Sequence, residues 1–120
     1  PPETESTMAD KARGEVEFTL AGETYTVRPT FKIISEIESA VGGVMPFLGR
    51  LRAGQWTITE ICAVMQCVLR AQPNAPKVRE IPDLVMAHED GPVGFIAPIA
   101  ELLSNAITGG EKPEGNGKAA

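Results

Sequence analysis

The sequence predicts an α+β fold that is mainly α, with an N-terminal β-hairpin followed by a bundle of about four helices. Alternation of polar and apolar residues is confined to residues 15–28, whereas helical spacing of apolar residues dominates from there to residue 108. Apolar residues make up 42% of the chain and aromatic residues only 5%, so the core must be mostly aliphatic.

Residues 15–20 and residues 24–28 each alternate polar and apolar side chains, which predicts two strands with one apolar face each. The short connection Ala21-Gly22-Glu23 is typical of a hairpin, and Pro29 ends the second strand because it has no N–H to donate. The two apolar faces consist of Val16, Phe18, Leu20, Tyr25 and Val27.

A first helix is predicted between Thr30, a plausible N-cap, and the terminating pair Gly42-Gly43. A short helix is predicted within residues 44–53, with Pro46 in its first turn. The apolar residues of the first helix are Phe31, Ile33, Ile34, Ile37 and Val41.

The clearest helix signal begins at Thr57, because Glu60 three residues later completes a capping box. This segment is expected to be the central helix of the bundle. Its apolar positions are Ile58, Ile61, Cys62, Met65, Val68 and Leu69.

Proline residues divide the remainder of the chain. Residues 72–76 break the central helix, and the next helix is expected mainly from Pro82 onward, with that proline in its first turn. A last helix is predicted over residues 93–108, ended by Gly109-Gly110.

The ends of the chain lack the apolar residues that a core requires. We therefore expect a disordered N-terminal extension over residues 1–12, one domain over residues 13–108, and a disordered tail over residues 109–120.

Composition argues against several classes of function. The formal net charge is −5, and phosphate recognition needs concentrated Lys and Arg, so no nucleic-acid partner is expected. No apolar run is long enough to span a membrane, and no signal peptide is visible, so a cytoplasmic protein is expected. Cys62 and Cys67 are badly placed on one helix to bond to each other and are interpreted as small buried residues.

No catalytic, metal or cofactor site emerges from the sequence. His88 is the only histidine, so neither a zinc site nor a nucleophile with its base can be assembled, and we interpret it as a helix-end residue. The glycine pairs are not followed by the Lys-Ser/Thr of a phosphate loop. The chain is therefore expected not to be an enzyme.

Without such a site, we expect the function to depend on contacts between the protein surface and a partner. A two-stranded hairpin has unpaired edges that could recruit another strand, and the apolar side of residues 93–107 is a second candidate contact. Trp56 is either an interface anchor or a hydrophobic staple or lid on the core. The candidate partner-binding side chains are Phe18, Tyr25, Trp56, Phe95, Ile99 and Leu102.

Several short segments, in their order, resemble a family of small proteins encoded among the tail genes of alphaproteobacterial gene transfer agents and related prophages. The resemblance extends over roughly residues 12–107. The segments that carry it are Ala12-Arg13-Gly14-Glu15-Val16, Tyr25-x-x-Arg28-Pro29-Thr30-Phe31, Ile37-Glu38 and Ala97-Pro98-Ile99-Ala100-Glu101-Leu102-Leu103.

The resemblance implies a non-enzymatic role in tail assembly, as a chaperone that binds the tape measure protein while the tail tube forms. It also implies a second possibility, a structural tail tube or minor tail component that is retained in the particle. A small regulatory or enzymatic domain unrelated to tails is a third hypothesis. For the chaperone role, the small acidic domain with its open hairpin could also assemble with copies of itself around a helical client.

Overall fold

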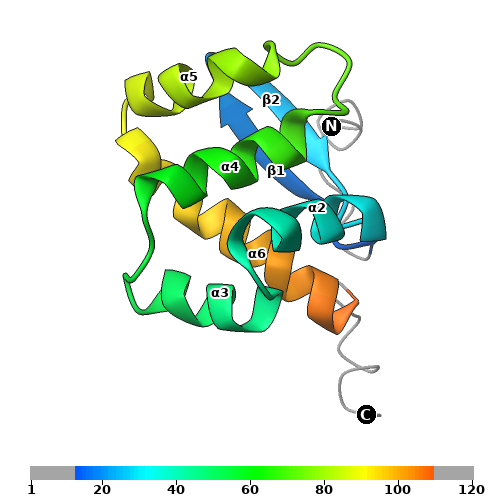
Figure 1. The fold of residues 1–120 in the computed structure, drawn as a ribbon. Helices are drawn as coiled ribbons and strands as arrows, with labels where there is room; N and C mark the ends of the chain where they lie inside the picture. Colours follow the sequence, from blue (N-terminus) through cyan, green and yellow to red (C-terminus); the bar gives the residue numbers. More distant parts are fainter. Residues whose placement is uncertain (1–12, 110–120) are drawn as a thin grey trace, which may run out of the picture.

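The computed structural model describes residues 13–109, and within this range the chain forms a β-hairpin followed by five α-helices (Figure 1). The α+β, mainly α fold is therefore as the sequence predicts. The elements are β1 (Val16–Leu20), β2 (Glu23–Val27), α2 (Phe31–Val41), α3 (Val44–Arg52), α4 (Ile58–Leu69), α5 (Ile81–Ala87) and α6 (Ile96–Thr108), with the 3₁₀ turns η2 (Val78–Glu80) and η3 (Gly91–Phe95).

The hairpin closes through a two-residue turn at Ala21-Gly22, and β2 begins at Glu23, which pairs with Leu20. Both turn residues have positive φ, 54° and 84°, which is the geometry of the type I′ turn that suits the twist of paired strands. Along β1 every second side chain is buried, and the two apolar side chains of β2 are buried as well, so the predicted apolar face is confirmed.

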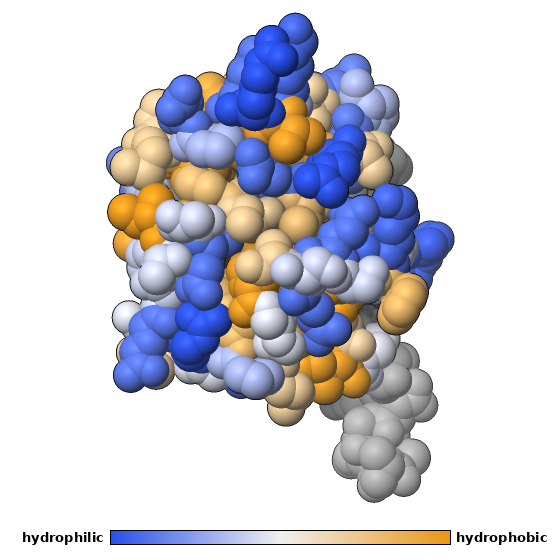
Figure 2. Space-filling model, in the orientation of Figure 1, coloured by the Kyte–Doolittle hydropathy of each residue, from blue (hydrophilic) through white to orange (hydrophobic). Residues whose placement is uncertain are grey.

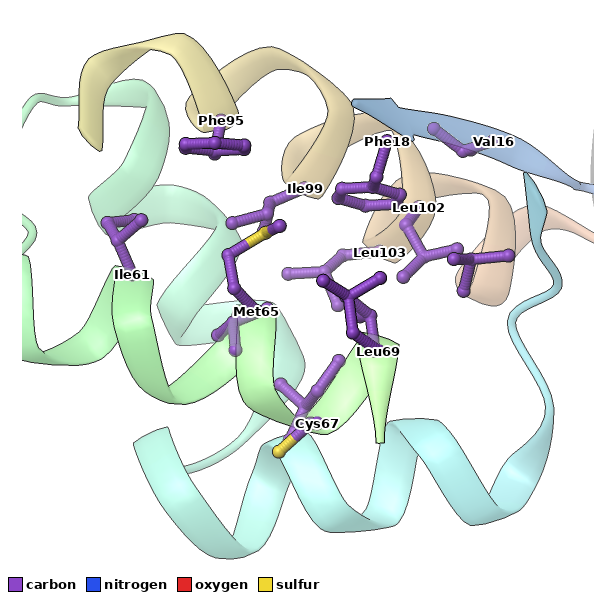
Figure 3. Close-up of a cluster of buried hydrophobic side chains, with 14 of the residues drawn as sticks. Val16, Phe18, Ile61, Met65, Cys67, Leu69, Phe95, Ile99, Leu102 and Leu103 are labelled. Atoms are coloured by element: carbon purple, nitrogen blue, oxygen red, sulfur yellow. The ribbon is translucent and has the colours of Figure 1, made fainter. Parts of the chain in front are cut away.

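Helix α4 lies at the centre of the bundle and contacts α2, α5 and β2. Seven of its twelve residues are buried, which explains why its apolar positions extend around most of the helix. Figure 3 shows Met65 and Leu69 of α4 directed toward the side chains of Phe18 in β1 and of Ile99, Leu102 and Leu103 in α6, while Ile61 points toward Phe95. The core is thus shared between the hairpin and the helices.

Helix boundaries follow local capping. Thr30 caps α2 by accepting a hydrogen bond from the Ile33 N–H at 3.2 Å. Both bonds of the Thr57–Glu60 capping box are present at the start of α4. Helix α5 carries its proline in the first turn, as predicted.

The last helix begins later than the sequence predicts, at Ile96 rather than residue 93. Residues 91–95 form a 3₁₀ turn that opens with Gly91-Pro92, and this tighter turn places Phe95 in the core just before α6. Gly109 ends α6 in the left-handed conformation. Of the predicted disordered segments 1–12 and 109–120, residues 1–12 and 110–120 lie outside the described residues.

Candidate interaction surface

The described residues contain no group of three metal-ligating side chains. Cys62 and Cys67 are free and buried, and burial raises the pKa of both thiols. Such thiols are poor nucleophiles because little thiolate forms at neutral pH. No helix in residues 13–109 is long and apolar enough to cross a membrane.

His88 has a structural environment at the end of α5. Its Nδ1 accepts a hydrogen bond from the Asp90 N–H at 3.1 Å, and its ring lies 4.7 Å from the Phe95 ring. A side chain at Gly94 would meet the imidazole at 3.0 Å. These contacts fix the turn between α5 and η3, which agrees with a helix-end role.

The structure places five of the six predicted partner-binding side chains inside the chain's own core. Phe18, Phe95, Ile99 and Leu102 are at most 1% exposed, and Tyr25 is 6% exposed with its hydroxyl donating to the Asn74 carbonyl at 3.3 Å. The expected apolar surface on residues 93–107 is likewise largely packed into the core, although Val93 and Ile107 at its two ends are exposed. Only Trp56 is partly exposed, packed against the core as a lid. Contact of these six side chains with a partner stays a prediction.

Other apolar side chains are the ones that reach solvent. On the face shown in Figure 2, hydrophobic residues appear as separate patches divided by polar residues. Phe31 stands out because it is 86% exposed. The exposed large apolar residues are Phe31, Met45, Ile58, Met86, Val93 and Ile107.

Phe31 projects from the first turn of α2, away from the side that α2 buries. Six residues at about 100° each place it about 120° around the helix axis from the buried Ile37. It therefore contributes little to the core, although its spacing in the sequence is compatible with the apolar stripe.

The start of α2 and the end of α6 lie at the same end of the molecule (Figure 1). Asn105 donates from Nδ2 to the Gly14 carbonyl at 3.1 Å, and a Cβ on Gly14 would lie 3.1 Å from Pro29 and 3.3 Å from Asn105. Phe31 lies two residues after Pro29 and Ile107 two residues after Asn105, and both side chains are exposed.

The two edges of the hairpin differ. On the outer edge of β2, the Thr26 carbonyl accepts a hydrogen bond from Gln72 Nε2 at 3.1 Å. Together with the Tyr25–Asn74 bond, this ties the proline-containing loop after α4 to β2. On β1, the described residues provide no hydrogen bond to the outward backbone groups of Glu17 and Thr19.

A family model described as "Phage tail tube protein, GTA-gp10" matches residues 13–109, the same residues that the structure describes. The chain belongs to the GTA-gp10 family of phage tail assembly chaperones. No curated protein and no solved structure matches this chain.

Membership in the GTA-gp10 family confirms the resemblance found in the short sequence segments. It makes this chain a non-enzymatic member of the tail assembly machinery of phages and gene transfer agents. The hypothesis of a regulatory domain unrelated to tails is therefore wrong.

Sequence reasoning missed Phe31 as a surface residue of this GTA-gp10 family chain. Its position directly after Thr30 was the available signal, because the first residue of a capped helix often lies beyond the buried stripe. The outer edge of β2 is covered and that of β1 is not, because Gln72 bonds to β2. Gln72 is distant from the hairpin in sequence, so no local pattern could predict this difference.

Proposed function

We propose that this chain is a chaperone that binds the tape measure protein during tail tube assembly, in the cytoplasm of the bacterial host, and is absent from the finished particle. The observation that carries the proposal is the family match over residues 13–109. A chaperone needs apolar contacts that remain available after its own core is complete, and the exposed side chains supply them.

Phe31 is the strongest candidate for the contact with this client. A large aromatic side chain that is 86% exposed can enter an apolar groove of a partner without disturbing the core. Polar residues on α2, including Lys32 with its ion pair to Glu36, form the surroundings of this contact.

Among the six side chains predicted from the sequence, Trp56 is the one that a client can reach while the core stays closed. It precedes the N-cap of α4 and is only partly buried. We assign it a secondary contact, because much of its surface already packs on the chain itself.

The test is capture of the tape measure protein encoded beside this chain's gene. An affinity-tagged wild-type chain and the variant Phe31→Ser are each co-expressed with that protein, and the captured amount is quantified. We expect Phe31→Ser to reduce capture by more than about tenfold, the effect of losing an aromatic hot spot.

Val93→Ser is the matched control, since Val93 is 61% exposed and lies in η3, away from the start of α2. It should retain wild-type capture. Equal capture by Phe31→Ser and wild type would overturn the assigned contact, and no capture by the wild type would overturn the chaperone proposal itself.

The family description as a tail tube protein favours a second candidate, a structural component that stays in the particle. Quantitative mass spectrometry of purified particles separates the two candidates. The chaperone proposal expects the chain at trace level relative to the tube subunit, whereas a structural component would be present in stoichiometric amounts.

A further inference from the structure

The outward backbone groups of β1 have no hydrogen-bond partner among the described residues. In the hairpin, Leu20 and Glu23 flank the two-residue turn as a hydrogen-bonded pair, so Thr19 and Thr24 form a non-hydrogen-bonded pair. The Thr19 and Thr24 hydroxyls lie 2.9 Å apart, which fits the closer spacing of side chains in such a pair.

This pairing determines where the backbone groups point. Glu17 and Thr19 direct their N–H and C=O groups away from β2, and Thr24 and Thr26 direct theirs away from β1. The β2 edge is partly covered by Gln72, whereas both residues of the β1 edge are exposed and unbonded on that side within the described chain. A further strand can therefore add to β1.

We propose that β1 pairs antiparallel with β1 of a second copy of this chain, which gives a four-stranded sheet in the order β2–β1–β1–β2. The described residues form a sheet of two strands, which is smaller than the commonest size of about four to six strands, and addition at the open edge reaches that size. The inner face stays continuous, because Val16, Phe18 and Leu20 of both copies point to the same side.

The side chains on the outer face select the register. If Glu17 lay opposite Glu17 of the partner copy, two carboxylates would oppose each other directly, which destabilises a sheet. If Thr19 lay opposite Thr19, the next pair would reach Ala21, whose φ of 54° is outside strand geometry.

A register centred on Phe18 avoids both problems and places Glu17 of each copy opposite Thr19 of the other. Each of these two pairs then exchanges both backbone hydrogen bonds, and the threonine hydroxyl can donate to the facing carboxylate. This register avoids direct opposition of the two Glu17 carboxylates and pairs the outward hydrogen-bonding groups of both strands, which is why a second copy is the occupant that fits the edge.

The molecular mass in solution tests the proposal, by sedimentation equilibrium over a range of concentrations with the full chain. The wild type should reach twice its monomer mass of 12.8 kDa. Thr19→Pro removes the outward N–H of β1 without removing a bond of the hairpin, and it should remain monomeric at concentrations where the wild type is a dimer.

Thr24→Pro is the matched control, because it removes an outward N–H from β2 and breaks the same Thr19–Thr24 contact. It should dimerise like the wild type. Circular dichroism checks that both variants are folded. A wild type that is monomeric throughout, or loss of the dimer in Thr24→Pro alone, would overturn the proposal.

Thr19→Lys tests the register without a proline. In the proposed pairing each lysine faces Glu17 of the other copy, so the dimer should tighten, about threefold or more, and the gain should fall with added salt. Weaker association of Thr19→Lys would contradict this register. Client capture is measured separately, so failure of the dimer leaves the chaperone proposal unaffected.

Discussion

Arg50 and Glu60 form a two-bond ion pair, with Nη1 to Oε1 and Nη2 to Oε2 both at 2.9 Å. The pair joins the end of α3 to the first turn of α4, and Arg50 also lies over the Phe47 ring at 5.1 Å. The same carboxylate accepts the Thr57 N–H at 3.1 Å as part of the capping box. One side chain thus serves both the start of the central helix and its junction with α3.

This arrangement predicts an acid-dependent contribution to stability. The hydrogen bond from Arg50 is the main cause that lowers the pKa of Glu60 below its usual value of 4.5, against an opposing effect of desolvation. Because the folded-state pKa is the lower one, the contribution is complete above pH 4.5 and is lost as the pH falls through the folded-state pKa.

Glu60→Gln should therefore be less stable than the wild type at neutral pH, and the difference should shrink in acid. Urea denaturation at several pH values measures it. Glu101→Gln, a substitution at an exposed position of α6, should show no such difference. A constant gap between Glu60→Gln and wild type at all pH values would contradict the assigned ion pair.

Thr57→Ala should destabilise the chain by about 1 kcal/mol, because the Glu60 N–H loses its side-chain acceptor at 3.0 Å. Thr59→Ala, two residues later in the exposed first turn of α4, should stay within about 0.5 kcal/mol of the wild type. Thermal unfolding of both variants provides the comparison. Equal losses would show that the cap contributes nothing specific.

A substitution in the hairpin turn should raise the free energy of unfolding. Ala21 adopts a φ of 54°, which asparagine tolerates better than alanine, so Ala21→Asn should raise the free energy of unfolding by about 0.5–1 kcal/mol. Gly22→Ala should lower it, since φ is 84° although no atom lies within 4 Å of the added Cβ. Chemical denaturation measures both, and a gain from Gly22→Ala would contradict the type I′ assignment.

Substitutions on the two sides of α2 should change the free energy of unfolding by very different amounts. Ile37→Ala removes a fully buried side chain and should cost about 2–5 kcal/mol. Phe31→Ala should stay within about 0.5 kcal/mol because that ring is 86% exposed. Urea denaturation at neutral pH separates them, and a large loss in Phe31→Ala would mean that the ring supports the fold rather than a partner.

The fold was predictable because local signals agree with the packing. Period-two alternation identified the buried face of the hairpin, and the Thr57–Glu60 capping box located the start of the central helix. The start of the last helix was missed, because helical spacing alone does not distinguish the 3₁₀ turn at residues 91–95 from a first turn of α-helix.

The candidate surface was harder to predict for a physical reason. An apolar periodicity identifies residues that can be buried, but it does not say whether the chain itself or a partner buries them. Phe95, Ile99 and Leu102 are buried in the chain's own core. Exposure of Phe31 and coverage of β2 by Gln72 both depend on tertiary contacts that no local pattern encodes.

Solubility of the tape measure protein on co-expression tests the proposed chaperone role most directly. The tape measure protein is produced alone, with the wild-type chain, and with Phe31→Ser, and its soluble fraction is measured after centrifugation. The proposal predicts that the wild-type chain raises the soluble fraction several-fold and that Phe31→Ser does so far less. An unchanged soluble fraction in the presence of the folded wild-type chain would contradict it.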